Sequence, residues 1–225
     1  SLEGYSDVYG AWGTFSGCTS LSKVTLPVSL QKIGVKAFYG CSSLSTIIIP
    51  EKVTYIGNSA FYNCTSLANV TIPQNVITIG ESAFSSCKSF TSVTIPDNVI
   101  TVGKGAFSSC SNITKATLSN SMTKVPDSIF SYCTALRSVS LPSNTVSIDK
   151  LAFNECENLS SISLPNSLTS IGMRAFSNCK SLRSISIPAN VITIDENAFN
   201  GCTALTGITI PGSVSAVGKS AFSDC

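Results

Sequence analysis

The chain has 225 residues with a net charge of +2, 43% hydrophobic residues, 12% charged residues and no histidine. The near-neutral charge argues against a nucleic-acid-binding protein, which normally carries a strongly basic face, and the hydrophobic content argues against disorder. The lack of histidine excludes Ser-His-Asp triads, Cys-His dyads and histidine-ligated zinc or haem. The sequence contains no run of 18 apolar residues, so no transmembrane helix is predicted. No signal peptide is visible.

Residues 1–17 precede a regular repeat and match it only near Gly13, Thr14 and Phe15. Because terminal repeats of an array are often atypical caps, we expect residues 1–17 to form a degenerate N-terminal repeat or a cap. The sequence stops at Cys225, at a repeat boundary and with no polar cap. We therefore interpret it as a fragment of a longer array, whose uncapped terminal repeats could associate end to end.

Ten cysteines at intervals of 23 residues define the repeat. When each cysteine is given offset zero, offset +20 is Phe in every unit, +3 is mostly Leu, +9 is mostly Pro, and +15 is Ile or Val. This period predicts nine tandem repeats over residues 18–225, forming a single solenoid domain. The cysteines are Cys18, Cys41, Cys64, Cys87, Cys110, Cys133, Cys156, Cys179, Cys202 and Cys225.

Each repeat is predicted to have three parts. Offsets +5 to +8 alternate between polar and apolar residues, as in residues 23–26, which predicts a strand with one buried face. Pro at +9 ends that strand, and the apolar pair at +12 and +15 predicts a short extended segment on the opposite wall. Gly at +16 is expected to supply an unusual backbone angle. Ala at +19, Phe at +20 and the next Cys are expected to share one face of a short helical turn.

The unit L-x-x-V-T-I-P-x-x-V-x-x-I-G-x-x-A-F-x-x-C, as it stands at residues 67–87 and 182–202, resembles the BspA-type (Treponema pallidum-type) leucine-rich repeat. The resemblance covers about residues 18–225. It implies a leucine-rich repeat solenoid: a right-handed coil with a parallel β-sheet on one face and short extended segments and helical turns on the other. It also implies an extracellular or cell-surface location, and some family members are adhesins that bind host extracellular-matrix proteins.

One repeat, residues 110–133, departs from the pattern. Ser119 stands where Pro is expected, Met122 occupies offset +12, Pro126 replaces Gly, and Ile129 replaces Ala. Two interpretations are open: sequence drift without consequence, or a local kink or contact point in the rod.

The cysteines fit a buried column of free thiols. Each lies three residues after Phe and four after Ala, which is the phase of a core residue. Regular stacking points the thiols parallel to one another instead of at each other, so we expect no disulfide. No paired C-x-x-C spacing predicts a metal site.

The outward strand positions form the candidate ligand-binding face. They are small hydroxyl residues with few charges, which are either solvated strand residues or a broad, weakly polar surface for a protein ligand. The polar row at offset +11 is expected to hydrogen-bond loop backbone along the array. The face comprises Lys23, Thr25, Thr46, Asn69, Thr71, Ser92, Thr94, Lys115, Thr117, Arg137, Ser140, Ser163, Arg183, Ser186 and Thr209.

Nothing in the sequence supports catalysis: the carboxylates show no recurring pair, and no phosphate-binding or dinucleotide glycine motif occurs. We therefore expect a non-enzymatic, adhesin-like binding module with no cofactor, no metal, no nucleic-acid partner and no membrane insertion. Its partner would be a protein ligand, including host extracellular-matrix proteins. The alternative is a passive structural spacer in a larger surface protein. A third hypothesis is ice binding by the threonine rows. The evidence against it is that the rows are interrupted by Lys23, Ile48, Asn69 and Lys115.

Overall fold

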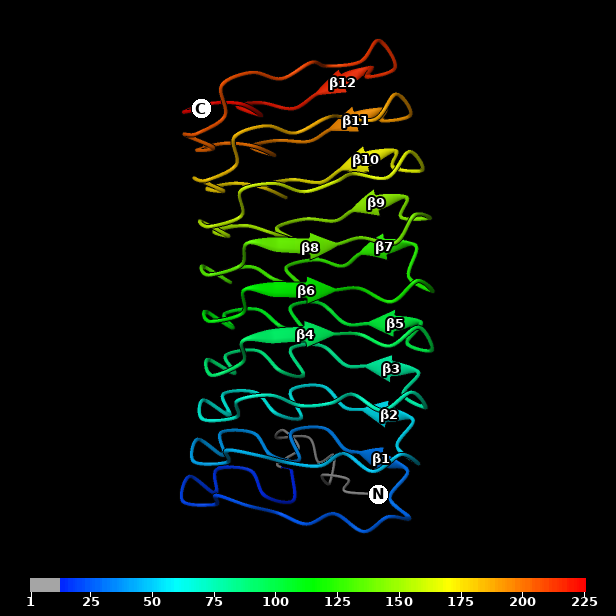
Figure 1. The fold of residues 1–225 in the computed structure, drawn as a ribbon, viewed down its shortest axis with the longest axis vertical. Helices are drawn as coiled ribbons and strands as arrows, with labels where there is room; N and C mark the ends of the chain where they lie inside the picture. The colour runs from blue at the N-terminus through cyan, green and yellow to red at the C-terminus, as the bar shows by residue number, and fades with distance from the viewer. Residues whose placement is uncertain (1–12) are drawn as a thin grey trace, which may run out of the picture.

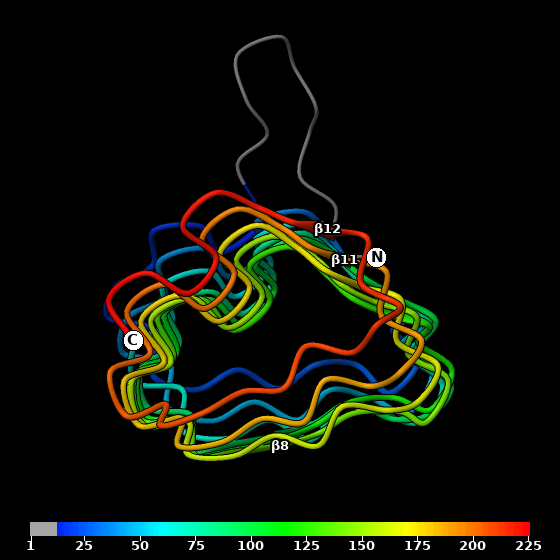
Figure 2. The ribbon, with the colours of Figure 1, turned by 90° about the horizontal axis from the view of Figure 1, so that it is seen from above.

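The computed structural model describes residues 13–225, which form one elongated solenoid of stacked coils (Figure 1). Every pairing in its ladders joins residues 23 apart, as in Lys32 with Tyr55 and Ser170 with Thr193. Seen along the axis, the coils superpose around a common interior (Figure 2). The predicted solenoid of 23-residue repeats is therefore confirmed. The prediction of a cap over residues 1–17 falls mostly outside the described residues.

The most extensive ladder lies at offsets +14 and +15, where the sequence predicted only a short extended segment. Here each coil contributes a two-residue parallel strand, and these form the sheets β1-β2-β3-β5 and β12-β11-β10-β9-β7. The +15 side chains point into the core and are buried in every strand except β12. The strands are β1 (Lys32–Ile33), β2 (Tyr55–Ile56), β3 (Thr78–Ile79), β5 (Thr101–Val102), β7 (Lys124–Val125), β9 (Ser147–Ile148), β10 (Ser170–Ile171), β11 (Thr193–Ile194) and β12 (Ala216–Val217).

The long wall, which we define as offsets +4 to +8 of all coils, holds a second parallel sheet at its centre. This sheet consists of β4 (Ser92–Thr94), β6 (Lys115–Thr117) and β8 (Ser138–Ser140), in the order β4-β6-β8. The predicted alternation holds there, since the central residue of each strand is buried between polar neighbours. Toward the N-terminal end, this wall has only an isolated bridge between Lys23 and Thr46.

Ala116 lies at the centre of this sheet. Both ladders of the sheet include Ala116, paired with Val93 on one side and Val139 on the other. Every other coil has Val or Ile at offset +6.

Offsets +16 to +22 form consecutive turns, so the short helical turn expected there is wrong. Residues 13–225 contain no helix, and accordingly none that could cross a membrane. The chain reverses through two residues with positive φ in each coil, at +18 and +22, for example Ser82 and Ser86. Left-handed backbone costs an L-residue about 1–2 kcal/mol. It is offset by hydrogen bonds between coils, such as the Phe38 N–H to the Ala60 carbonyl at 2.7 Å.

The expectation that Gly at +16 supplies an unusual angle is also wrong. None of these glycines has a positive φ. They are required for close approach between coils: a Cβ on Gly57 would lie 2.6 Å from the carbonyl carbon of Gly34.

The core is a set of columns that run the length of the array. The Phe rings at +20 stack with nearly parallel planes, and Phe38 and Phe61 have ring centroids 5.2 Å apart. The cysteines, the +3 aliphatic residues and the +15 aliphatic residues form parallel buried columns beside them. Every coil therefore covers an apolar face of its neighbour, which is how repeat arrays gain stability.

The ladder breaks between β5 and β7, where Figure 1 shows a wider gap. In the other coils the +16 residue donates its N–H to a carbonyl of the preceding coil, as Gly103 does to Ile79 at 2.8 Å. Pro126 occupies this position and has no N–H to donate. On the core side, the Phe107 and Phe130 rings are 5.9 Å apart. The atypical repeat therefore coincides with a break in this ladder, and a kink of the rod stays a prediction.

Candidate ligand-binding surfaces

The sequence-predicted face lies together on the long wall, the side labelled β8 in Figure 2. All of its residues are exposed except Thr117, which is half-buried. The regular ladder of this wall is confined to β4, β6 and β8, so the wall is not one continuous sheet. Beyond β8, the loosely joined coils leave a hollow of about 560 Å³ flanked by Ser163 and Ser186. A second hollow of about 430 Å³ lies beside Lys23 and Ile48.

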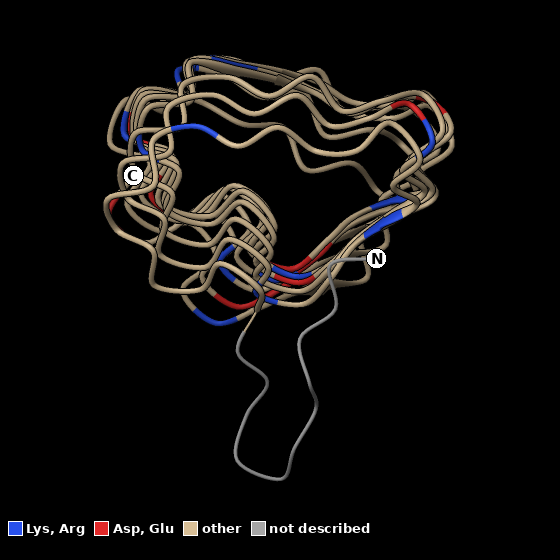
Figure 3. Ribbon diagram, turned by 90° about the horizontal axis from the view of Figure 1, so that it is seen from below, with Lys and Arg blue, Asp and Glu red and all other residues tan. Residues whose placement is uncertain are grey.

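The long wall carries positive charge only. Offsets +2 to +8 hold no Asp or Glu in any repeat, and their charged residues are Lys23, Lys115, Arg137 and Arg183. Figure 3 shows the acidic segments at the corner and on the other walls. In residues 13–225, the single ion pair joins Lys180 and Glu157 at 2.9 Å, just outside this set of offsets.

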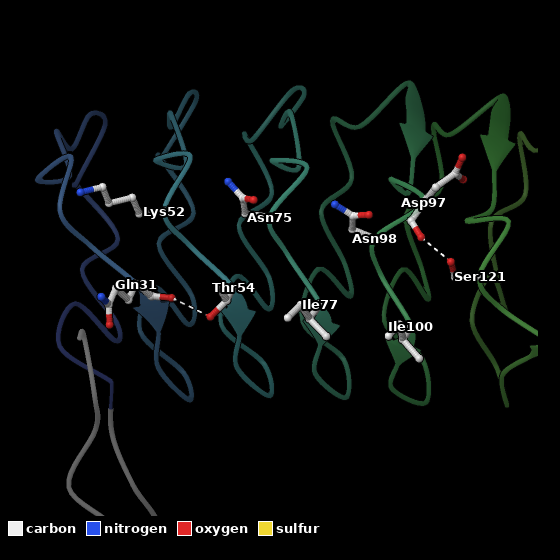
Figure 4. A pocket seen from close by; sticks show the side chains of 9 residues that line it. All are labelled: Gln31, Lys52, Thr54, Asn75, Ile77, Asp97, Asn98, Ile100 and Ser121. Atoms are coloured by element: carbon white, nitrogen blue, oxygen red, sulfur yellow. Dashed lines mark hydrogen bonds between the residues drawn. The ribbon is translucent and has the colours of Figure 1, made fainter.

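A groove of about 720 Å³ lies along the corner after the long wall, and its lining side chains are drawn in Figure 4. One bank is the +11 row and the other is the +13 row, so the groove runs across successive coils. Ile77 and Ile100 occupy the +13 bank and are 48% and 64% exposed. The lining residues are Gln31, Lys52, Thr54, Asn75, Ile77, Asp97, Asn98, Ile100 and Ser121.

Sequence reasoning missed this groove, although a signal for it was present. Offset +13 is apolar in several repeats, and at Ile77, Ile100, Val146 and Ile192 it lies between two core positions, +12 and +15. A side chain between two inward-facing positions of an extended segment must point outward. An apolar residue at +13 therefore predicts exposed apolar surface.

The polar bank of the groove is built by side chains that bond to the backbone. The Nδ2 of Asn75 donates to the Glu51 carbonyl at 2.8 Å, and that of Asn98 donates to the Gln74 carbonyl at 2.7 Å. This confirms the expectation for the +11 row. It also fixes the amide planes and leaves each Oδ1 as an acceptor on the groove side.

Asp97 marks the end of the groove beside the atypical repeat. Its two carboxylate oxygens accept hydrogen bonds from the backbone N–H of Asn120 at 2.9 Å and from the Asn120 side chain at 3.1 Å. These bonds, the backbone one first, lower the pKa of the Asp97 carboxyl below its ordinary value. Asp97 is therefore an acidic group held at one end of the groove, with Lys52 toward the other (Figure 4).

The cysteine column is a structural element of the core. All ten are free thiols, and the eight from Cys41 to Cys202 are buried. Each of these donates its thiol hydrogen to a Phe carbonyl of the preceding coil, as Cys64 does to Phe38 at 3.1 Å. Burial is the main cause that raises the pKa of Cys64 to about 12. Such thiols are poor nucleophiles. Over residues 13–225, no three Cys, Asp or Glu side chains are grouped as a metal site requires.

The solved structures to which this chain is similar include bacterial leucine-rich repeat proteins. A Bacteroides ovatus leucine-rich repeat protein is 26% identical, with a TM-score of 0.71 over 94% of this chain and 78% of that chain. The Treponema pallidum protein TpLRR is 31% identical, with a TM-score of 0.66 over 71% of this chain and 77% of its own. A leucine rich cell surface protein of Faecalibacterium prausnitzii is 30% identical, with a TM-score of 0.54 over 94% and 72%.

The comparison with curated proteins finds no match. The family model of the BspA type leucine rich repeat region matches residues 12–137 and 123–225, which together span nearly the whole chain. The match agrees with the 23-residue register of the ladders and with the buried Phe, Cys and aliphatic columns. The chain belongs to the BspA-type leucine-rich repeat family.

Proposed function

We propose that the chain is a non-catalytic binding module of an extracellular or cell-surface protein, and that it holds an extended segment of a protein ligand along its axis. A surface location is supported by the family and by the similar Faecalibacterium prausnitzii protein, which is described as a cell surface protein. A non-catalytic role is supported by a family fold built on repeats and by cysteines committed to core hydrogen bonds.

The groove in Figure 4 is the observation that carries this proposal. Ile77 and Ile100 offer apolar surface at its centre, and Asn75 and Asn98 present fixed amide oxygens opposite them. Exposed apolar side chains rimmed by polar groups are typical of surfaces that bind another protein. Since the groove crosses several coils, the proposed ligand is a segment that lies along the axis of the solenoid.

The hydroxyl face predicted from the sequence enters the proposal as a second, weaker contact surface. Its exposed Thr and Ser side chains, for example Thr71 and Thr94, offer hydrogen bonds without large apolar anchors. Contacts of this kind contribute mainly when many act together on one ligand.

The test is direct binding of immobilised protein to a panel of extracellular and matrix proteins at physiological salt. The double variant Ile77→Ser/Ile100→Ser should weaken saturable binding by about tenfold or more. Ile192→Ser is the matched control, because Ile192 has the same offset and is 50% exposed but lies outside the groove. Ligand binding that survives the double variant unchanged would exclude the groove. Failure of the wild-type protein to bind any member of the panel would favour the passive spacer.

A further inference from the structure

The hollow between Arg137 and Arg183 differs chemically from the groove and lies on another wall. It has a volume of about 550 Å³ and is lined by Arg137, Asn158, Ser160, Ser181, Arg183 and Ser184. The two arginines share offset +4 and are two coils apart. At about 4.8 Å per strand spacing, this places their backbones roughly 10 Å apart.

The cationic groups of this hollow have no partners of their own. Both arginines are exposed, and among residues 13–225 no hydrogen bond or ion pair engages either guanidinium. The nearest acid in the sequence, Glu157, pairs with Lys180 at 2.9 Å. No acidic residue lies at offsets +2 to +8 of any coil. The attraction of this wall for an anion is therefore not cancelled by a neighbouring carboxylate.

The remaining lining specifies more than charge. The hydroxyls of Ser160, Ser181 and Ser184 have no protein hydrogen-bond partner within residues 13–225 and can donate or accept. Asn158 donates its Nδ2 to the Thr134 carbonyl at 2.9 Å, which leaves its Oδ1 to accept. No aromatic or aliphatic side chain lines the hollow. It therefore offers an apolar protein segment no anchor, but it offers partners to a ligand that is both acidic and rich in hydroxyl groups.

We propose that this hollow binds an acidic polysaccharide. Each arginine would hold a carboxylate or sulfate group through its planar fork of N–H donors, a geometry that matches both oxyanions. The serine hydroxyls and the Asn158 amide oxygen would hydrogen-bond the sugar hydroxyls between the two acidic groups. Lys115, whose strand position pairs with Ser138 next to Arg137, extends the positive charge along the wall.

The test measures binding of the intact chain to four probes at physiological salt. They are a sulfated heparin oligosaccharide, a carboxylated alginate oligosaccharide, a neutral dextran of equal length, and a poly-glutamate peptide. We expect at least one acidic oligosaccharide to bind and dextran not to bind. The first two probes decide between sulfate and carboxylate, and binding of either supports the proposal. Absence of binding to both, or tighter binding of poly-glutamate than of either, would overturn it.

Three variants locate the site. Arg137→Gln/Arg183→Gln should raise Kd by about tenfold or more, because charge-assisted hydrogen bonds are lost at two places. Arg137→Lys/Arg183→Lys should retain part of the affinity, since it keeps the charges but loses the forks. Arg174→Gln removes one positive charge from the turn side, where Arg174 is exposed, and should leave Kd unchanged. If Arg174→Gln and Arg137→Gln/Arg183→Gln raised Kd equally, the effect would be one of net charge. That result would overturn the proposed site.

The outcome is separate from that of the protein-binding groove. The Ile77→Ser/Ile100→Ser variant should bind the acidic oligosaccharide as the wild type does, because those residues line a different hollow. Failure of one proposal therefore leaves the other standing.

Discussion

The thiol of Cys133 donates a hydrogen bond to the carbonyl oxygen of Phe107 in the preceding coil, at a sulfur-to-oxygen distance of 3.2 Å. The same link recurs at each cysteine from Cys41 to Cys225, for example at Cys156 with Phe130. The cysteine that marks each 23-residue repeat therefore makes a specific hydrogen bond between coils, in addition to filling space in the core. A cysteine supplies both a small apolar group and a hydrogen-bond donor at the position that faces a Phe carbonyl of the preceding coil.

The thiol column should make the stability of the array fall at alkaline pH. Burial raises the pKa of Cys110 from 9.0 to about 12, and that of Cys133 and Cys156 well above 9.0. The folded thiols stay neutral while those of the unfolded chain ionise. Their contribution is thus complete below pH 9 and is lost between pH 9 and about 12. Each fully buried thiol should reduce the free energy of unfolding by about 1.4 kcal/mol per pH unit in that window.

Thermal unfolding between about pH 7.5 and 10.5 measures this dependence. The variant Cys133→Ala/Cys156→Ala should be less stable than the wild type near neutral pH but should lose stability less steeply above pH 9. Cys18→Ala, at an exposed position, is the control and should keep the wild-type slope. An unchanged slope in the double variant would show that other groups cause the alkaline loss.

Gly80→Ala should destabilise the array by about 1–3 kcal/mol through overpacking. A Cβ at Gly80 would lie 2.5 Å from the backbone nitrogen of Asn58 and 2.6 Å from the carbonyl carbon of Gly57. These are backbone atoms of the adjacent coil, which cannot move independently. Gly207→Ala is the matched control, because no atom lies within 4 Å of its added Cβ. Urea unfolding of both variants measures the difference, and equal midpoints would contradict close approach as the role of the +16 glycines.

The break at the atypical repeat should be visible in hydrogen exchange. The Thr169 amide donates to the Val146 carbonyl at 2.8 Å, and the corresponding residue of each neighbouring coil does the same. Thr123 occupies this offset next to the Pro126 break, and its amide makes no such bond to Ile100 within residues 13–225. Its exchange should therefore be faster than that of Thr169 by at least about tenfold. Equal protection of the two amides, read by NMR or by mass spectrometry, would show that the ladder continues through this repeat.

The period and the apolar columns could be predicted from the sequence because a repeat exposes them many times over. Phe38, Cys41 and Leu44 are buried where their spacing placed them. The turns could not be assigned correctly, because spacings of three and four residues suit a helix as well as a pair of tight turns. The left-handed residues at +18 and +22 include Leu151 and Tyr132, which carry no local signal for that conformation. Hydrogen bonds between coils impose it.

The candidate surfaces were predicted less completely for a related reason. The alternation at offsets +5 to +8 predicted the exposed residues of the long wall, apart from the half-buried Thr117. The confinement of the ladder to β4, β6 and β8 could not be predicted, because all coils share a similar alternation at these offsets. The hollow between Arg137 and Arg183 lies on this wall beyond β8, so it depends on spacing between coils that no single repeat encodes.

The ladders and the thiol hydrogen bonds have one further consequence, which concerns the order in which the coils fold. Every pairing partner lies 23 residues away and every thiol acceptor 26 residues away, so no coil waits for a distant segment. During synthesis, each newly emerged coil can pair with the coil directly before it. Folding can thus proceed coil by coil, because each folded coil presents the same kind of backbone and core surface to the coil that follows it.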